Sequence, residues 1–429
     1  MGLFVFLLKA YLAVTVGVIL LYTARHYVFT LNRAFARQRL YPQDLLDSDW
    51  PRVSVLIPMH NEEAVASTVL DAVLRADYPR DRLEIIPIDD GSTDRTPEIL
   101  AGYQQRDPRV RPLRRADDAP RGKQHGLNDG LAVAQGEIVV VYDADYVPPR
   151  GQIRELVAAF LDPRVGAVMG RVVPVNADRN LLTRILDLER AGGYQVDQQA
   201  RYNLGLVPQY GGTVGAFRAD LVRALGGFDP QVLAEDTELT FRLVTRGWRV
   251  AYANHAECYE EAPERWRVRA RQIRRWSRGH NQVLFRYALR VWRTPHLPTF
   301  WQRLDAFLLL GIYAQPFLMS LAILDSVVLF FLGEMRLVVG VWILLALAAY
   351  NAIGNFAPYF EIGLAVFLDG GGRRLWLLPI FYFVFVFNLF HASLGFVDAV
   401  RDRWGRRTVT WHKTERYAAG AARLRSTTT

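Results

Sequence analysis

Residues 137–145 read EIVVVYDAD, an apolar run that ends in two carboxylates separated by one residue. The run is short and rich in β-branched residues, which predicts a buried strand over residues 137–142. Asp143 and Asp145 would then point the same way at its carboxyl end, because alternate residues of an extended chain share a side. Two carboxylates can hold Mg²⁺ or Mn²⁺ when substrate phosphates and water complete the coordination. The alternative is a solvated turn.

Strand and helix patterns alternate over residues 50–260. β-branched runs predict further strands at residues 53–57, 83–88 and 110–113. Amphipathic segments predict helices at residues 62–76, 97–105 and 124–134. Such βαβ repetition predicts a mostly parallel sheet with helices on both faces. Ligands of such a sheet bind at the carboxyl ends of its strands.

Polar residues follow the first two predicted strands. They are Pro58, Asn61 and Glu62 after the first strand, and Asp89 and Asp90 after the second. Each loop precedes a helix, whose unpaired N–H groups can bind an anion or a nucleotide, while a carboxylate can accept from the ring N–H of a base. Alternatively, Asn61, Ser92 and Asp94 are helix N-caps.

Lys123 lies at the start of the helix predicted at residues 124–134. It follows a glycine, but the GxxxxGK[ST] frame of a P-loop is absent from the sequence around it. Lys123 either pairs with a phosphate at the helix N-terminus or is an ordinary exposed lysine.

Glu235 and Asp236 begin a further amphipathic segment. The helix dipole favours acidic residues in a first turn, which is the plain structural explanation. The functional alternative is that one of them is the general base that removes a proton from an attacking hydroxyl.

Residues 264–279 read ERWRVRARQIRRWSRG, with seven arginines and two tryptophans. An amphipathic helix of this composition would lie at a membrane surface, with its tryptophans buried and its arginines reaching lipid phosphates. A second interpretation is that Trp276 stacks on a sugar ring while Gln272 and Arg275 bind hydroxyls or a leaving diphosphate.

Apolar residues gather at the two ends of the chain. Residues 3–22 carry Lys9 as their only charge and are long enough to cross a membrane. A cleaved signal peptide is the alternative, but the apolar stretch is too long for one and no small-residue cleavage site follows it. The positive-inside rule places the next segment in the cytoplasm, because four arginines follow the apolar stretch, at positions 25, 33, 37 and 39.

Three further apolar blocks lie near residues 304–332, 338–356 and 375–396. Three crossings would leave the basic tail outside the cell. We therefore expect either that one block lies in the membrane interface or that residues 358–368 form a further element, with the tail inside.

The length of 429 residues exceeds the core of a usual single domain, so more than one structural unit is expected. Subtracting 43 acidic from 52 basic residues gives a net charge of +9, and arginines beside the apolar blocks account for much of it. No pattern of a nucleic-acid-binding module is present, so we expect no nucleic-acid partner. The one cysteine, Cys258, excludes a disulfide framework and a Cys-based zinc site.

These motifs, in this order, resemble the processive membrane-integrated family 2 glycosyltransferases, the superfamily of cellulose synthase, hyaluronan synthase and poly-N-acetylglucosamine synthase. The resemblance covers residues from about 50 to 280 and is most specific at Gln272-x-x-Arg275-Trp276. It implies an α/β cytoplasmic domain of the GT-A type, with a mostly parallel, Rossmann-like sheet, combined with transmembrane α-helices. Ala234 stands where many members have threonine, which leaves the subfamily open.

The resemblance implies a role for each matching residue. Asp236 is the implied catalytic base, and Asp143 and Asp145 are the implied ligands of Mg²⁺ or Mn²⁺. The residues implied to bind the nucleotide sugar are Pro58, Asn61, Glu62, Asp89, Asp90, Lys123 and Asp143, with Asp89 or Asp90 as the uridine contact. Those implied at the acceptor and diphosphate are Gly212, Thr213, Glu235, Gln272, Arg275 and Trp276.

The implied enzyme is an inverting, processive hexosyltransferase. It would use a UDP-sugar, with glucose or N-acetylglucosamine, to extend a β-linked polysaccharide at the cytoplasmic face of the inner (plasma) membrane and thread it outward. The alternative is a single transfer to a lipid acceptor. The implied partners are the UDP-sugar donor, the growing glycan, the lipid bilayer and accessory secretion subunits.

Five segments follow from this interpretation. They are an N-terminal transmembrane helix (1–31), a GT-A domain (50–260), amphipathic interfacial helices (261–300), a C-terminal transmembrane region (301–400) and a basic cytoplasmic tail (401–429).

A transporter whose soluble domain senses a nucleotide is a rival from another class. It would need ionisable residues inside several membrane spans. Asp305, Asp325 and Glu361 are few and lie near block ends or in interrupted stretches, so the sequence favours an enzyme.

Overall fold

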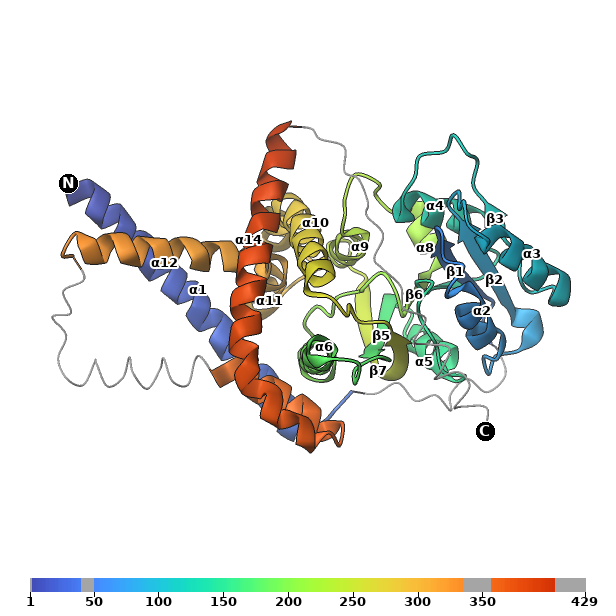
Figure 1. The fold of residues 1–429 in the computed structure, drawn as a ribbon, viewed down its shortest axis with the longest axis horizontal. Helices are drawn as coiled ribbons and strands as arrows, with labels where there is room; N and C mark the ends of the chain where they lie inside the picture. The colour runs from blue at the N-terminus through green and yellow to red at the C-terminus, as the bar shows by residue number, and fades with distance from the viewer. Residues whose placement is uncertain (1, 40–49, 335–355, 406–429) are drawn as a thin grey trace.

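The computed structural model describes residues 2–39, 50–334 and 356–405. Long helices, among them α1, α12 and α14, lie on one side, and the sheet with its covering helices lies on the other (Figure 1). The predicted combination of an α/β domain with long apolar helices is confirmed.

Seven strands of the described chain form one mixed sheet, in the order β3-β2-β1-β4-β6-β5-β7. Their bounds are β1 (Val53–Met59), β2 (Leu83–Asp89), β3 (Leu113–Arg114), β4 (Ile138–Val141), β5 (Val165–Pro174), β6 (Gly215–Arg218) and β7 (Arg249–Glu260). β1 to β4 pair in parallel, as do β5 and β7, while β6 runs antiparallel to β4 and β5. The sheet is therefore mostly parallel, as predicted.

The strand expected at residues 110–113 is wrong in extent. Val110 makes only an isolated bridge with Ile85, and the strand itself is the two residues of β3. The other three predicted strands match β1, β2 and β4 closely.

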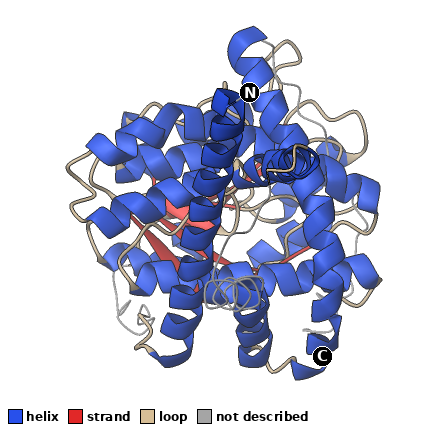
Figure 2. Cartoon of the chain, turned by 90° about the vertical axis from the view of Figure 1, so that its left-hand side faces the viewer, coloured by secondary structure: helices blue, strands red, loops and turns tan. Residues whose placement is uncertain are grey.

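Helices cover both faces of the sheet because alternate residues of its central strands are apolar. Val55 and Val140 pack in a cluster with residues of α2 (Ala66–Leu74) and α5 (Gln152–Ala158). Leu56 and Val139 pack in a second cluster with residues of the helices opposite. Figure 2 shows the strands enclosed between helices.

The remaining helices of this domain follow the chain. They are α3 (Thr96–Arg106), α4 (Lys123–Val133), α6 (Leu181–Ala191), the π-helix η4 (Gly192–Gln198), α7 (Gln199–Asn203), α8 (Ala219–Ala224) and α9 (Glu235–Val244), with short 3₁₀ turns η2 (Arg80–Arg82) and η3 (Ala159–Leu161).

Two described helical segments are long and apolar enough to cross a membrane. One is α1 (Gly2–Phe35), and the other is Gly372–Trp404, which joins the 3₁₀ segment η5 (Gly372–Ile380) to α14 (Phe381–Gly405). A shorter apolar helix occupies Phe356–Leu368. The predicted block at residues 338–356 and most of the basic tail lie outside the described residues.

The apolar block predicted at residues 304–332 is not one straight helix. It consists of α11 (Phe300–Gly311) and α12 (Gln315–Phe331), which meet at a bend of 73°. Pro316 lies in the first turn of α12. Proline has no N–H to continue a preceding helix but fits the start of a new one, which explains the break.

The basic and aromatic stretch at residues 264–279 forms the first part of α10 (Trp266–Arg293). Two of its arginines make ion pairs with α14, Arg274 with Asp398 and Arg278 with Asp402. These two guanidinium groups therefore have protein partners, in place of the lipid phosphates expected for them.

Candidate functional site

A cavity of about 570 Å³ lies where β1 and β4 end and α9 and α10 begin. It gathers most of the residues singled out in the sequence. Those that line it are Pro58, Glu62, Asp90, Lys123, Asp143, Asp145, Thr213, Glu235, Asp236, Gln272, Arg275 and Trp276. Four segments far apart in the chain thus meet at the carboxyl edge of the sheet, as α/β topology favours.

Asn61 lies in the first polar loop but does not line the cavity. It has a left-handed backbone (φ 54°), and its side-chain oxygen accepts from the N–H of Thr93 at 2.7 Å. The N-cap alternative is wrong, because Val65 and Arg95 precede α2 and α3 and neither helix has a side-chain cap. Asn61 instead ties the loop after β1 to the loop after β2.

Of the two predicted uridine contacts, only Asp90 reaches the cavity. Asp90 Oδ2 accepts from the N–H of Gly122 at 2.9 Å, and its Oδ1 pairs with Arg115. Asp89 is 2% exposed and accepts from the N–H of Ser92 at 2.9 Å. Asp89 therefore shapes the loop from inside.

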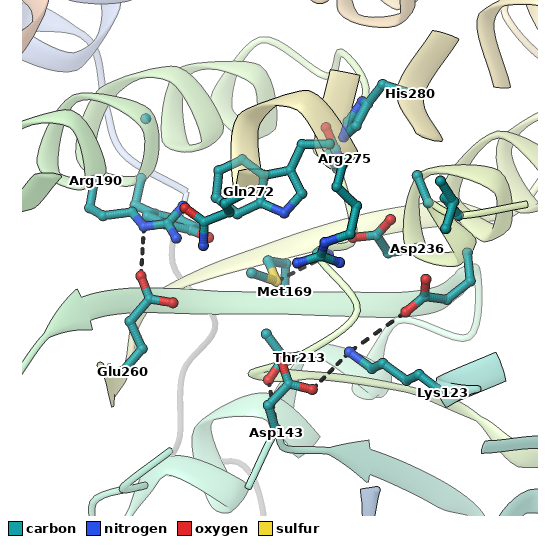
Figure 3. Close-up of a pocket in the computed structure, with 18 of the residues that line it drawn as sticks. Lys123, Asp143, Met169, Arg190, Thr213, Asp236, Glu260, Gln272, Arg275 and His280 are labelled. Atoms are coloured by element: carbon teal, nitrogen blue, oxygen red, sulfur yellow. Dashed lines mark hydrogen bonds and ion pairs between the residues drawn. The ribbon is translucent and has the colours of Figure 1, made fainter. Parts of the chain in front are cut away.

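Lys123, the first residue of α4, connects three walls of the cavity (Figure 3). Its Nζ lies 2.8 Å from Asp143 Oδ1 and 3.6 Å from Glu235 Oε1, and it donates to the carbonyl oxygen of Gly212 at 3.1 Å. Burial opposes its charge, but the carboxylates of Asp143 and Glu235 outweigh burial and hold the pKa of Lys123 above its ordinary value. The exposed-lysine alternative is therefore excluded.

Glu235 begins α9 and is 6% exposed. Burial raises its pKa from 4.5 to about 7; Lys123 opposes this shift, and the neighbouring Asp236 adds to it. Gln124 donates to its Oε2 at 3.4 Å. Two adjacent carboxyl groups at one helix start thus differ in environment.

Asp236 faces the loop that contains Gly212. Its Oδ1 accepts from the N–H of Thr237 at 2.6 Å. Gly212 (φ 70°) and Val214 (φ 49°) both have left-handed backbones. This conformation is costly for a β-branched residue, and such strain is concentrated at functional sites.

Trp276 packs against two guanidinium groups, Arg190 at 5.2 Å and Arg269 at 5.3 Å from its ring centre. Arg190 also pairs with Glu260 at 2.7 Å, and Arg269 donates to Gln272 Oε1 at 2.9 Å. The expected stacking of Trp276 on a sugar must therefore compete with these cation–π contacts.

His280 was missed in the sequence, although it lines the cavity. Its Nε2 hydrogen-bonds with Thr237 Oγ1 at 3.3 Å, and its ring lies 4.7 Å from that of Tyr313. Burial lowers its pKa, with Asp236 opposing, so the imidazole is neutral at pH 7. The available signal was its spacing of four residues from Trp276, which places both on one face of a helix.

The carboxylates of Asp143 and Asp145 fit a divalent cation that is completed by substrate. Both lie beyond the end of β4, and both line the cavity. Within the described ranges, no group of three or more His, Cys, Asp or Glu side chains could hold a metal ion. Mg²⁺ is usually held by one or two carboxylates together with water and substrate phosphates, which agrees with a two-carboxylate site.

The cavity also reaches the long apolar helices. Arg25 and His26 of α1, Ile312 and Tyr313 between α11 and α12, and Glu361 of the helix Phe356–Leu368 line this part of its wall. None of these residues was assigned to the site from the sequence.

The chain resembles proteins of known family. The family described as "Glycosyltransferase like family 2" matches residues 51–279. The probable glycosyltransferase YdaM of Bacillus subtilis is 31% identical over 410 residues, which cover 92% of each protein. The beta-monoglucosyldiacylglycerol synthase of Synechocystis sp. is 34% identical over 238 residues, 56% of this chain and 50% of that protein.

The fold also matches a solved structure. A mannosyltransferase from Pyrobaculum calidifontis, in complex with GDP-Man and Mn²⁺, superposes with a TM-score of 0.63. The match covers 93% of this chain and 99% of that one at 24% identity, so it bears on the fold alone.

Proposed function

Since the chain belongs to glycosyltransferase family 2 and is a hexosyltransferase of GT-A fold, we propose that it transfers a hexose from a UDP-sugar, with inversion at the anomeric carbon. The observation that carries this proposal is the convergence of Lys123, Asp143 and Asp236 on one cavity. Family membership also decides against the transporter alternative, because the catalytic and not merely a sensing domain is present.

We assign the role of general base to Asp236. Thr237 engages Oδ1, so Oδ2 is the oxygen that takes the proton of the acceptor hydroxyl. As that proton moves to Oδ2, the acceptor oxygen bonds to the anomeric carbon, and the bond from that carbon to the diphosphate breaks. UDP leaves with the electron pair of the broken bond.

The diphosphate gains charge in this step, and Lys123 and Arg275 are the cations at hand. Lys123 is held in place by Asp143 and the carbonyl oxygen of Gly212, so it is already oriented when substrate binds. Asp143 and Asp145 would hold Mg²⁺ or Mn²⁺. A bound divalent ion supplies further stabilisation of the charge on the leaving diphosphate.

The remaining site residues position the two substrates in this proposal. Asp90 accepts from the uracil ring, with Pro58, Asn61, Glu62 and Asp89 shaping the loops beside it. Gln272, Trp276, Gly212 and Thr213 bound the acceptor side, and Glu235 keeps Lys123 in position.

The acceptor has two candidates. A growing β-glycan is supported by the resemblance at Gln272, Arg275 and Trp276, whose side chains line the cavity. A membrane lipid modified once is supported by the reach of the same cavity into α1 and the helix Phe356–Leu368. In both cases the catalytic domain would face the cytoplasm from the inner (plasma) membrane, with the tail at residues 401–429 on the same side.

A donor panel tests the activity. The full-length enzyme in detergent with Mn²⁺ is given UDP-glucose, UDP-N-acetylglucosamine or GDP-mannose, and release of the nucleotide is measured. One UDP-sugar should support turnover, and its labelled product is then sized. Long chains support the polysaccharide, whereas one added sugar in the organic phase supports the lipid. Turnover with GDP-mannose alone would overturn the UDP assignment.

A further inference from the structure

His26 of α1 and Glu361 of the helix Phe356–Leu368 form a polar pair at the membrane end of the cavity. His26 Nδ1 hydrogen-bonds with Glu361 Oε2, and both residues line the cavity. The Glu361 side chain is only 7% exposed and that of His26 is 25% exposed. Ionisable side chains on membrane helices are costly and are concentrated along substrate pathways, so this pair calls for a ligand.

The pair has the chemistry to bind a hydroxyl. The contact between the two side chains uses Nδ1 and Oε2, and each side chain has a second polar atom, Nε2 and Oε1. A hydroxyl both donates and accepts, so it can donate to the carboxylate of Glu361 while it contacts the imidazole of His26.

The charges at this end of the cavity favour an uncharged ligand. Arg25 pairs with Asp197 and lies 3.4 Å from Asp305, and Arg190 pairs with Glu260 at 2.7 Å. Both guanidinium groups that line this end are thus neutralised by carboxylates. A phosphate would meet the carboxylate of Glu361, which disfavours an anionic headgroup.

The surrounding walls suit an amphiphile. Leu309, Ile312 and Ile362 line the cavity beside the polar pair. On the same short helix as Ile362, Phe360 and Phe367 are 58% and 71% exposed, as expected of side chains that face lipid tails. A headgroup held at His26 could therefore keep its acyl chains among the membrane helices.

The wall opposite this helix is also specialised. Gly192 begins the π-helix η4, and a Cβ atom on it would lie 3.0 Å from Ile362 Cγ1. A Cβ atom on the next residue, Gly193, would meet no atom within 4 Å. Both glycines line the cavity, and π-helices are found mostly at functional sites.

From these observations we infer that His26 and Glu361 form the acceptor site for the uncharged, hydroxyl-bearing headgroup of a membrane lipid, such as the glycerol of a diacylglycerol. The inference rests on the proposed transferase function and selects the lipid among its two acceptors. The lipid hydroxyl is directed from this pair toward Asp236, which lines the same cavity.

Acceptor preference of the wild-type enzyme is the first test. The enzyme is reconstituted in phosphatidylcholine vesicles that contain diacylglycerol, phosphatidic acid or neither, with a soluble cello-oligosaccharide as a further acceptor. Labelled sugar should enter the organic phase only with diacylglycerol. Equal transfer to phosphatidic acid, or label found only in water-soluble product, would overturn the inference.

Two variants locate the site. Glu361→Gln keeps the side-chain shape and should raise the KM for diacylglycerol about tenfold, with a much smaller change in the KM for the UDP-sugar. His26→Phe should act in the same direction. Glu334→Gln is the matched control, because Glu334 pairs with Lys9 of α1 at 2.7 Å outside the cavity.

The outcomes separate this inference from the proposed function. An unchanged KM for diacylglycerol in both Glu361→Gln and His26→Phe would overturn the lipid site. Loss of nucleotide release from the wild-type enzyme with every donor and acceptor would instead overturn the transferase proposal. Melting curves of the variants in detergent identify any variant that fails to fold, and the wild-type acceptor comparison needs no variant.

Discussion

A Cβ atom on Gly212 would lie 2.9 Å from Cβ of Asp236 and 3.2 Å from its Oδ2. No side chain other than hydrogen fits between the loop and this carboxylate without displacing one of them. The left-handed backbone of Gly212 (φ 70°) further restricts the position to glycine.

Gly212→Ala should therefore displace Asp236 and lower kcat by a factor on the order of 100. Gly205→Ala is the matched control, because Gly205 has the same backbone (φ 68°) but its Cβ atom would approach only Arg39, at 3.9 Å. Both variants should lose stability by about 1 kcal/mol, while only Gly212→Ala loses activity. Equal kcat values in the two variants would contradict this reading of the loop.

Asp236→Asn should reduce kcat by ~100-fold or more, because the amide cannot accept the acceptor proton. Nucleotide release is the measurement. Asp220→Asn serves as the control, since Asp220 also lies in a first helical turn but its side chain is 96% exposed. Normal turnover by Asp236→Asn with a melting midpoint equal to wild type would remove the base assignment.

His280→Phe should lower kcat about tenfold, because it keeps the ring beside Tyr313 but loses the hydrogen bond with Thr237 that supports Asp236. His280→Gln can restore a donor to Thr237 and should recover part of the loss. Thr237→Val should reproduce the defect. A role in packing alone predicts that Phe is tolerated better than Gln, which is the opposite order.

Glu235→Gln should change how stability depends on pH. Burial raises the pKa of Glu235 from 4.5 to about 7, so between these values the folded chain holds a proton that the unfolded chain has lost. Wild-type stability thus falls as pH rises through this window and stays lower above it. The glutamine cannot ionise and escapes the loss.

The melting midpoint of Glu235→Gln should therefore gain on wild type from about pH 5 to about pH 8, by a difference on the order of 3 kcal/mol in unfolding free energy. Glu98→Gln is the control, because Glu98 also lies in a first helical turn but is exposed. A difference that does not vary with pH would show that Glu235 ionises as easily in the folded chain as in the unfolded one.

Local pattern was enough to locate Asp143, Asp145, Glu235 and Asp236. Each lies where a regular element ends or begins, and the apolar period around it fixes that position in the fold. Because strands of a parallel sheet end at one edge, neighbouring strand ends could be assigned to one site without coordinates.

Other residues could not be assigned in this way because their roles arise between distant segments. His26 and Glu361 are separated by 335 positions and meet only when two membrane helices pack together. Asn61 had the composition of an N-cap, but its oxygen is used by a loop from another strand. Such choices depend on tertiary contacts that no local period records.

The participation of α1 in the cavity wall has a consequence for the fate of the donor. If the first 35 residues were removed, Arg25 and His26 would no longer close that side, and bulk water could approach the sugar bound near Asp236. Water would then compete as the nucleophile, and the shortened enzyme would become a wasteful nucleotide-sugar hydrolase. The anchor of this protein thus also protects its substrate from the solvent.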